Sequence, residues 1–88
     1  MVRVVTRIAY SKDALKTLSR IPANVAKTIR AKMEQYAAAP ESLANNVRAL
    51  KGEAGTYRLR VGDWRVVFTQ DMRVIAVIRI APRGGAYE

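Results

Sequence analysis

The chain has 88 residues, half of them apolar, with sixteen Lys and Arg against seven Asp and Glu and a net charge of +9. This length supports one domain, residues 1–88, with one modest core, and the apolar content excludes a disordered basic tail. Without cysteine or histidine, the chain has no disulfides, thiol nucleophiles, imidazole bases or zinc sites of the usual kind. The charge favours nucleic acid, with an acidic protein or an anionic membrane surface as competitors; a merely soluble basic surface is also open.

The N-terminal stretch is interrupted by arginines and does not resemble a signal peptide. No apolar run approaches the length that crosses a bilayer. We therefore expect a cytoplasmic protein that does not associate with membranes.

The first half of the chain predicts a strand followed by two helices. Arg3–Ala9 is rich in β-branched residues, which favour a strand. Ser11 is a good N-cap for a short helix, and Pro22 suits the first turn of a second helix that ends before Pro40. The apolar positions at helical spacing are Ala14, Leu15 and Leu18 in the first helix, and Val25, Ile29, Met33 and Tyr36 in the second.

The second half predicts a loop, a hairpin and a last strand. Residues 43–55 indicate a loop with one helical turn at most. Thr56–Thr69 alternates apolar and polar residues around Gly62-Asp63, which suits a two-residue hairpin turn. Arg73–Ala81 is predicted as the last strand; its core, Val74–Ile78, is apolar on both faces, as is typical of a central strand. Residues 82–88 form an irregular tail.

The hairpin has two chemically different faces. Around a Gly62-Asp63 turn, Arg60 faces Arg65 and Arg58 faces Val67, so the three arginines share one face. The other face carries Tyr57, Leu59, Val61, Trp64, Val66 and Phe68. Because like charges opposite each other are destabilising, this arrangement favours an anionic ligand over a merely solvated strand face.

The element order β-α-α-β-β-β predicts the α+β class, with two N-terminal helices packed on one face of a mostly antiparallel four-stranded sheet. The apolar side of the hairpin would meet the helices and leave the arginines open. Spacing alone does not fix which strand lies beside the first.

The sequence contains no paired carboxylates, catalytic triad or glycine-rich phosphate loop, and its acids are too scattered for a metal site, so no metal or cofactor is expected. What remains is an arginine cluster suited to a nucleic-acid backbone, because guanidinium groups bind phosphate oxygens in bidentate fashion. Lys51, Arg79 and Arg83 are candidate additions, and Tyr87 could stack on an unpaired base.

Three segments and two tail residues carry a resemblance. Leu50-Lys51-Gly52, Tyr57–Phe68 and Val74–Ile80, followed by Arg83 and Tyr87, resemble the RelE/ParE toxin superfamily of type II toxin–antitoxin systems. The likeness covers residues 43–87 in pattern and residues 1–40 in element order. It implies a cognate antitoxin, which we expect to be an acidic protein.

The RelE-like branch is favoured, and it implies a ribosome-dependent endonuclease that cleaves mRNA in the A site without a metal. In that reaction a 2′-hydroxyl attacks the adjacent phosphate. The resemblance assigns catalytic positions to Arg65, Arg83, Tyr87 and Arg60, and RNA-binding positions to Lys51, Arg58 and Arg79. The alternatives are a ParE-like toxin that inhibits DNA gyrase without nuclease activity, and a basic nucleic-acid-binding protein that is not toxic.

The general base is the weak point of the nuclease hypothesis. Arg60 stands where the superfamily often has lysine, and arginine is effectively always charged. Tyr87, with an ordinary pKa of about 10, would serve only if the arginines lowered that pKa. Catalysis would therefore rest mainly on stabilising charge at the phosphate, and on alignment by the ribosome.

Overall fold

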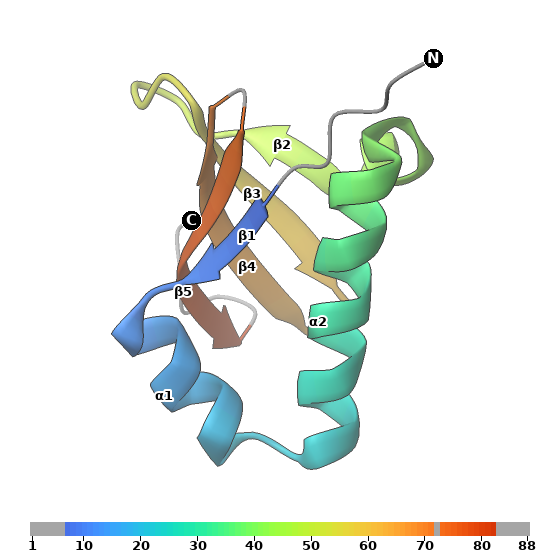
Figure 1. Cartoon of the computed structure of the whole chain (residues 1–88), viewed down its shortest axis with the longest axis vertical. Helices are drawn as coiled ribbons and strands as arrows, with labels where there is room; N and C mark the ends of the chain where they lie inside the picture. Colours follow the sequence, from blue (N-terminus) through green and yellow to red (C-terminus); the bar gives the residue numbers. More distant parts are fainter. Residues whose placement is uncertain (1–6, 72, 83–88) are drawn as a thin grey trace.

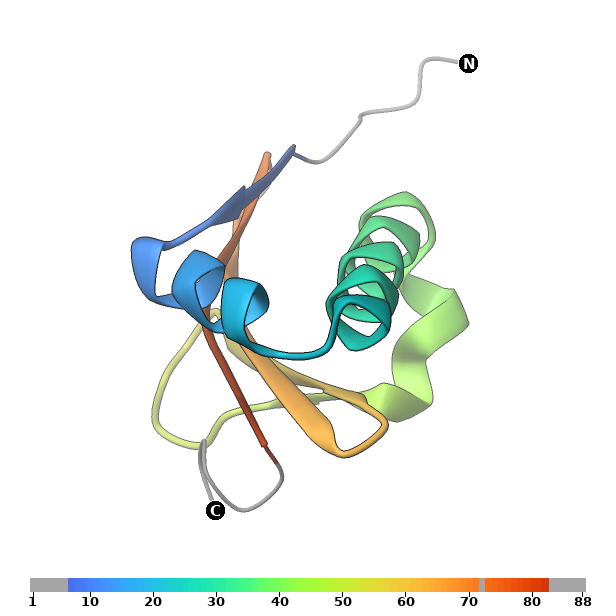
Figure 2. The same cartoon turned by 90° about the horizontal axis from the view of Figure 1, so that it is seen from below.

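A computed structural model describes residues 7–71 and 73–82 of the chain. In chain order its elements are β1 (Arg7–Tyr10), α1 (Lys12–Arg20), α2 (Ala23–Ala38), the 3-10 helix η1 (Pro40–Asn46), β2 (Val47–Ala49), β3 (Thr56–Val61), β4 (Trp64–Gln70) and β5 (Val74–Pro82). The strands form one sheet in the order β1-β5-β4-β3-β2. Both α-helices lie on the same side of this strongly twisted sheet (Figures 1 and 2).

The predicted α+β class is confirmed, with one strand more than expected. Val47–Ala49, predicted as loop, forms the edge strand β2 and pairs antiparallel with β3. Three residues are too few for an alternating pattern to stand out in the sequence. β5 is an interior strand of the sheet, as predicted, and lies between β1 and β4. β1 pairs with it in parallel, which settles the neighbour that spacing left open. Residues 3–6 of the first predicted strand lie outside the described residues.

Helix α1 begins where its cap was predicted. The Ser11 hydroxyl accepts a hydrogen bond from the backbone N–H of Ala14 and donates one to the carbonyl of Ile78, both at 3.0 Å. Ala14 and Leu18 are buried against the sheet, whereas Leu15 is 45% exposed, so its predicted core position is wrong. A nine-residue helix rests on the sheet through a narrow i, i+4 stripe, and Leu15 falls beside that stripe.

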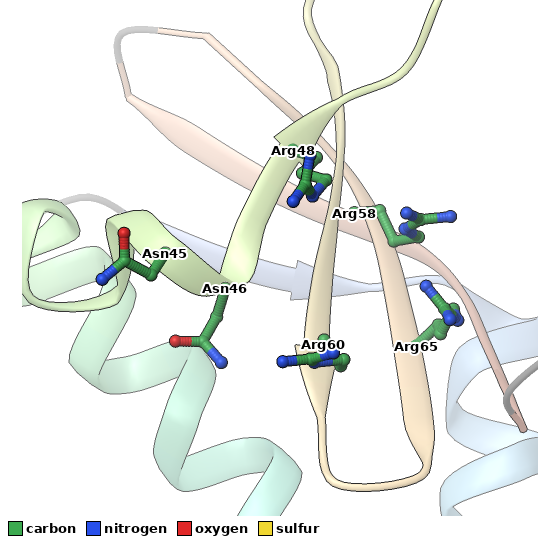
Figure 3. A pocket seen from close by; sticks show the side chains of 6 residues that line it. All are labelled: Asn45, Asn46, Arg48, Arg58, Arg60 and Arg65. Atoms are coloured by element: carbon green, nitrogen blue, oxygen red, sulfur yellow. The ribbon is translucent and has the colours of Figure 1, made fainter.

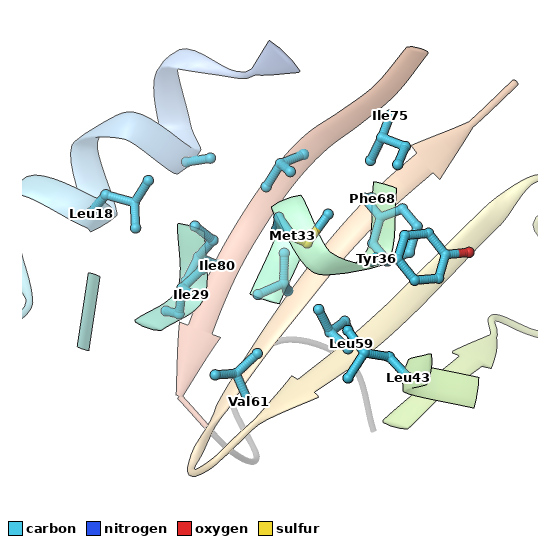
Figure 4. Packing of buried hydrophobic residues seen from close by; sticks show 13 residues of the cluster. Leu18, Ile29, Met33, Tyr36, Leu43, Leu59, Val61, Phe68, Ile75 and Ile80 are labelled. Atoms are coloured by element: carbon cyan, nitrogen blue, oxygen red, sulfur yellow. The ribbon is translucent and has the colours of Figure 1, made fainter. Parts of the chain in front are cut away.

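Helix α2 covers the middle of the sheet with the predicted stripe (Figure 4). Ile29, Met33 and Tyr36 are buried, and the Tyr36 ring meets Phe68 edge to face at 5.2 Å between centroids. The Tyr36 hydroxyl donates a 2.8 Å hydrogen bond to Gln70, so the polar end of this buried ring is satisfied. Phe68 also stacks on Tyr57 at 5.7 Å and thus joins α2 to the hairpin.

The β3–β4 hairpin has the predicted register, with Gly62 at φ +58° in the turn. Glycine suits this position because other residues pay a steric penalty at positive φ. Between β4 and β5 the register shifts: Val67 pairs with Arg79 and Phe68 with Val77, so Ile78 is an extra, bulged residue. Val77 and Ile80 are therefore both buried, while Ile78 and Arg79 are both exposed.

Candidate functional site

The arginines of four strands lie on the sheet face opposite the helices. Arg60 on β3 pairs with Arg65 on β4. In the neighbouring row, Arg48 on β2 pairs with Arg58, Arg58 with Val67, and Val67 with Arg79 on β5. Paired residues share a face of an antiparallel sheet. We call this set the arginine face: Arg48, Arg58, Arg60, Arg65 and Arg79.

A cavity of about 200 Å³ opens on this face at the β2 side (Figure 3). Its lining is Asn45, Asn46, Arg48, Arg58, Arg60 and Arg65, which we call the arginine pocket. Four guanidinium groups and two amides form it, and no acidic side chain is among the lining residues. A positive, acid-free hollow concentrates anions, since the fields of its charges add.

Arg65 differs from the other arginines of the pocket because one nitrogen of its guanidinium, Nε, is both buried and without a hydrogen-bond partner among the described residues. A buried donor without an acceptor costs free energy, roughly 1–3 kcal/mol. A ligand rich in acceptor oxygens, such as a phosphate, would offset that cost on binding.

The structure brings together part of the predicted site. Arg58, Arg60 and Arg65 line one pocket, and Arg79 shares their face one strand away. Lys51 lies exposed in the turn between β2 and β3 and is not among the residues that line the pocket.

Arg83 and Tyr87 lie outside the described residues, so their predicted positions beside the pocket stay predictions.

Three residues of the pocket were missed by sequence reasoning. Arg48, Asn45 and Asn46 all come from the stretch that was predicted as loop. The Val-Arg-Ala alternation of residues 47–49 is too short to indicate a strand by itself, and Arg48 is placed opposite Arg58 only once β2 is known. The helical turn before it, η1, then brings the two asparagines to the same side.

The side chains that line the arginine pocket determine which chemistry it can support. Guanidinium groups donate hydrogen bonds and carry permanent charge, and amides neither gain nor lose protons near neutral pH. The pocket can therefore hold and polarise an anion, but none of its lining residues is a proton acceptor suited to general base catalysis.

Elsewhere among residues 7–71 and 73–82, no three His, Cys, Asp or Glu side chains are grouped to hold a metal ion. Neither α1 nor α2 has the length and apolar character of a membrane-spanning helix.

The groups with perturbed pKa values are not among the residues that line the pocket. Backbone N–H groups of Arg73 and Val74 donate to the Asp71 carboxylate at 2.8 and 2.7 Å and lower its pKa. Burial raises the pKa of Tyr10 and of Tyr36. These groups belong to the framework: Asp71 closes the turn before β5, Tyr10 on β1 lies under Arg30 of α2, and Tyr36 packs from α2 against Phe68.

Comparison with known protein families shows which family the chain belongs to. Residues 8–87 match the family described as the ParE toxin of the type II toxin-antitoxin system, parDE. The chain belongs to this family. It thereby falls in the RelE/ParE superfamily and is a toxin of the type II class, as the resemblance implied. Curated protein sequences yield no match to this chain.

Solved structures of the superfamily share the fold. The archaeal RelE–RelB complex from Pyrococcus horikoshii OT3 is similar over 93% of this chain and 99% of that chain, at 25% identity and a TM-score of 0.78. A mutant of the E. coli toxin RelE in the free state is similar over 93% of this chain and 86% of that chain, at 20% identity and a TM-score of 0.74. The RelBE2 toxin–antitoxin complex from Mycobacterium tuberculosis is similar over 91% of this chain and 100% of that chain, at 20% identity and a TM-score of 0.66. At these lower identities the likeness is one of fold.

Proposed function

We propose that this toxin is a ribosome-dependent endoribonuclease that cleaves mRNA. The observation that carries the proposal is the arginine pocket, with four guanidinium groups and no acidic residue in its lining. An RNA backbone offers acceptor oxygens to guanidinium groups, and arginine binds phosphate in bidentate fashion. The ribosome as site of action also implies a cytoplasmic location.

The proposed reaction is transfer of the phosphate to the neighbouring 2′-oxygen. The O2′–P bond forms and the P–O5′ bond breaks, which leaves a 2′,3′-cyclic phosphate and a 5′-hydroxyl; the 2′-hydroxyl gives up its proton and O5′ gains one. Arg60 and Arg65 face each other across the hairpin, where they can bind the non-bridging oxygens as their negative charge grows. Loss of one such contact typically costs about 10²–10³ in rate.

The remaining predicted residues have supporting roles in this proposal. Arg58 holds a phosphate from within the pocket, while Arg79 on the same face and Lys51 in the neighbouring turn guide the RNA backbone. Arg83 is proposed as a further contact to the transition state and Tyr87 as the group that takes the 2′ proton. The mRNA would be aligned by the ribosome, which supplies the geometry that a weak base needs.

We propose a cognate antitoxin of acidic composition as the regulatory partner. The similar structures from P. horikoshii and M. tuberculosis are toxin–antitoxin complexes. A net charge of +9 attracts an acidic chain, and covering the arginine face would block the substrate.

The test is induced expression of the chain followed by mapping of mRNA 5′ ends. The wild type should produce new 5′ ends within translated messages, and Arg65→Ala with Arg83→Ala should reduce them at least 10²-fold. Arg20→Ala, an arginine at the exposed end of α1, is the matched control and should cleave as the wild type does. Intact messages in arrested cells would refute the nuclease, and cleavage unchanged in the double variant would refute the proposed arginine-based mechanism.

The family match supports a second candidate, inhibition of DNA gyrase, because its description names ParE. Under this alternative the arginine face binds a protein target and no RNA is cut. The discriminating result is an SOS response with cleaved DNA while translation continues.

A further inference from the structure

The arginine pocket has a second kind of side chain, the amides that η1 places along its β2 side. Asn46 ends η1 and is half-buried, directly before Arg48 and the rest of β2. Figure 3 shows the guanidinium of Arg60 extending toward the side chain of Asn46, with Asn45 farther out on η1. The amide of Asn46 thus borders the space that the arginines surround.

These amides supply what the guanidinium groups cannot. Arginine only donates hydrogen bonds, so the two asparagines bring the only side-chain acceptors in the lining of the pocket. A phosphate consists of acceptors and leaves an amide carbonyl unused. A nucleobase edge carries donors and acceptors side by side, and in RNA each base lies next to a phosphate.

We infer that Asn46, with Asn45 at the rim, binds the edge of a nucleobase whose phosphate is held by Arg58, Arg60 and Arg65. The inference rests on the proposed function and identifies the residues of that site that determine its base specificity. The cavity of about 200 Å³ is smaller than the roughly 300–1,000 Å³ of sites for drug-sized ligands. It therefore takes one nucleotide of a longer strand, while the neighbouring nucleotides lie over the exposed arginines.

Adenine is the base that an asparagine amide reads best, since the amide oxygen accepts from the exocyclic amine and the amide nitrogen donates to the ring nitrogen beside it. A two-point contact of this kind discriminates by roughly 10-fold or more. The arginines contribute equally to every sequence, because they contact the backbone.

The experiment measures binding of the purified full-length chain to two fluorescent hexamers at one fixed salt concentration. One is hexaadenylate, and the other is an abasic hexamer with the same ribose-phosphate backbone. The wild type should bind hexaadenylate about 10-fold more tightly or better. Asn46→Ala should bring this ratio close to one and leave the affinity for the abasic hexamer unchanged.

Two further variants make the result specific. Arg60→Gln should weaken binding of both hexamers by the same factor and preserve the ratio. Asn24→Ala changes an exposed asparagine of α2 that does not line the pocket, so it should behave as the wild type. Asn46→Ala and Asn24→Ala should unfold at the same denaturant concentration as the wild type to within experimental error, and Arg60→Gln at the same or a higher one, which excludes a folding defect.

The inference is overturned if the wild type binds both hexamers equally or binds neither. It is also overturned if Asn46→Ala weakens both to the same extent, since Asn46 would then only position Arg60. If an acidic peptide displaces the hexamers from the wild type but not from Asn46→Ala, the amide binds a protein partner instead, which also overturns the inference. Each of these results leaves the nuclease proposal to be decided by the 5′ ends of the messages, so the two can fail separately.

Discussion

The two faces of the sheet are made by the same strands and serve opposite purposes. On the helix side, Leu59, Val66 and Phe68 are fully buried in the hydrophobic core. On the other side, Arg58, Arg60 and Arg65 alternate with them along the chain and surround a pocket. Because successive residues of a strand point to opposite faces, one short hairpin provides both the core and the proposed binding site. Burial of the apolar side stabilises the fold. On the other side, repulsion between neighbouring arginines opposes folding, and the same arginines form the proposed anion site.

Val67 is the exception that shows how the two faces are joined. It lies in the arginine row, flanked in register by Arg58 and Arg79, yet its exposed fraction is 0%. It lies on β4, which has a strand on each side of it. A buried valine between two arginines separates like charges that would otherwise be direct neighbours.

The largest effect is expected on the helix side. Phe68→Ala removes a fully buried ring that contacts both Tyr36 and Tyr57. We expect a loss of about 3–5 kcal/mol in the free energy of unfolding, measured by denaturant titration. Leu15→Ala, on the exposed side of α1, is the control and should cost less than about 1 kcal/mol. Equal losses in the two variants would contradict this description of the core.

A change of opposite sign is expected on the arginine face. Arg60→Gln removes the charge opposite Arg65 and should raise the free energy of unfolding by about 0.2–1 kcal/mol at low salt. The gain should shrink as salt screens the repulsion. The same titration at two salt concentrations tests it, with Arg20→Gln as the control. Destabilisation by Arg60→Gln would show that Arg60 and Arg65 do not repel each other across the hairpin.

The smallest effect concerns the turn that sets β5 against β4 and so serves both faces. Hydrogen bonds from Arg73 and Val74 lower the pKa of Asp71 below its ordinary 3.8, so the ionised carboxylate stabilises the fold above that pH. Asp71→Ala should lower the thermal midpoint at pH 7, and its difference from the wild type should narrow as the pH falls below 3.8. Asp71→Asn keeps an acceptor oxygen but does not titrate, so its difference at pH 7 should be smaller. A difference for Asp71→Ala that is the same at every pH would contradict the prediction.

Sequence reasoning succeeded where the local pattern was long enough. The hairpin register followed from alternation around Gly62, and the stripe of α2 from helical spacing through Ile29, Met33 and Tyr36. Both are local periodicities that span several repeats. The family resemblance rested in part on the hairpin and was confirmed by the match over residues 8–87.

What sequence reasoning missed was decided by pairing between distant segments. Three residues form β2 only because β3 is available beside them, and with β2 come Arg48 and the two asparagines of the pocket. The parallel pairing of β1 with β5 joins strands from opposite ends of the chain, and no local pattern encodes it. The same holds for Leu15, whose exposure depends on how α1 rests on the sheet.

The bulge in β5 has a consequence for comparing the lengths of related chains. If Ile78 were absent, Val77, Arg79 and Ile80 would alternate as in a regular strand, and each would still face the side it faces now. A one-residue alignment gap at this position is therefore compatible with an unchanged sheet. What such a gap would remove is the carbonyl that accepts the Ser11 hydroxyl, 67 positions away in the chain. A relative without this residue would hold the start of its first helix through the other contact alone, in which the Ser11 backbone N–H donates to the carbonyl of Val77.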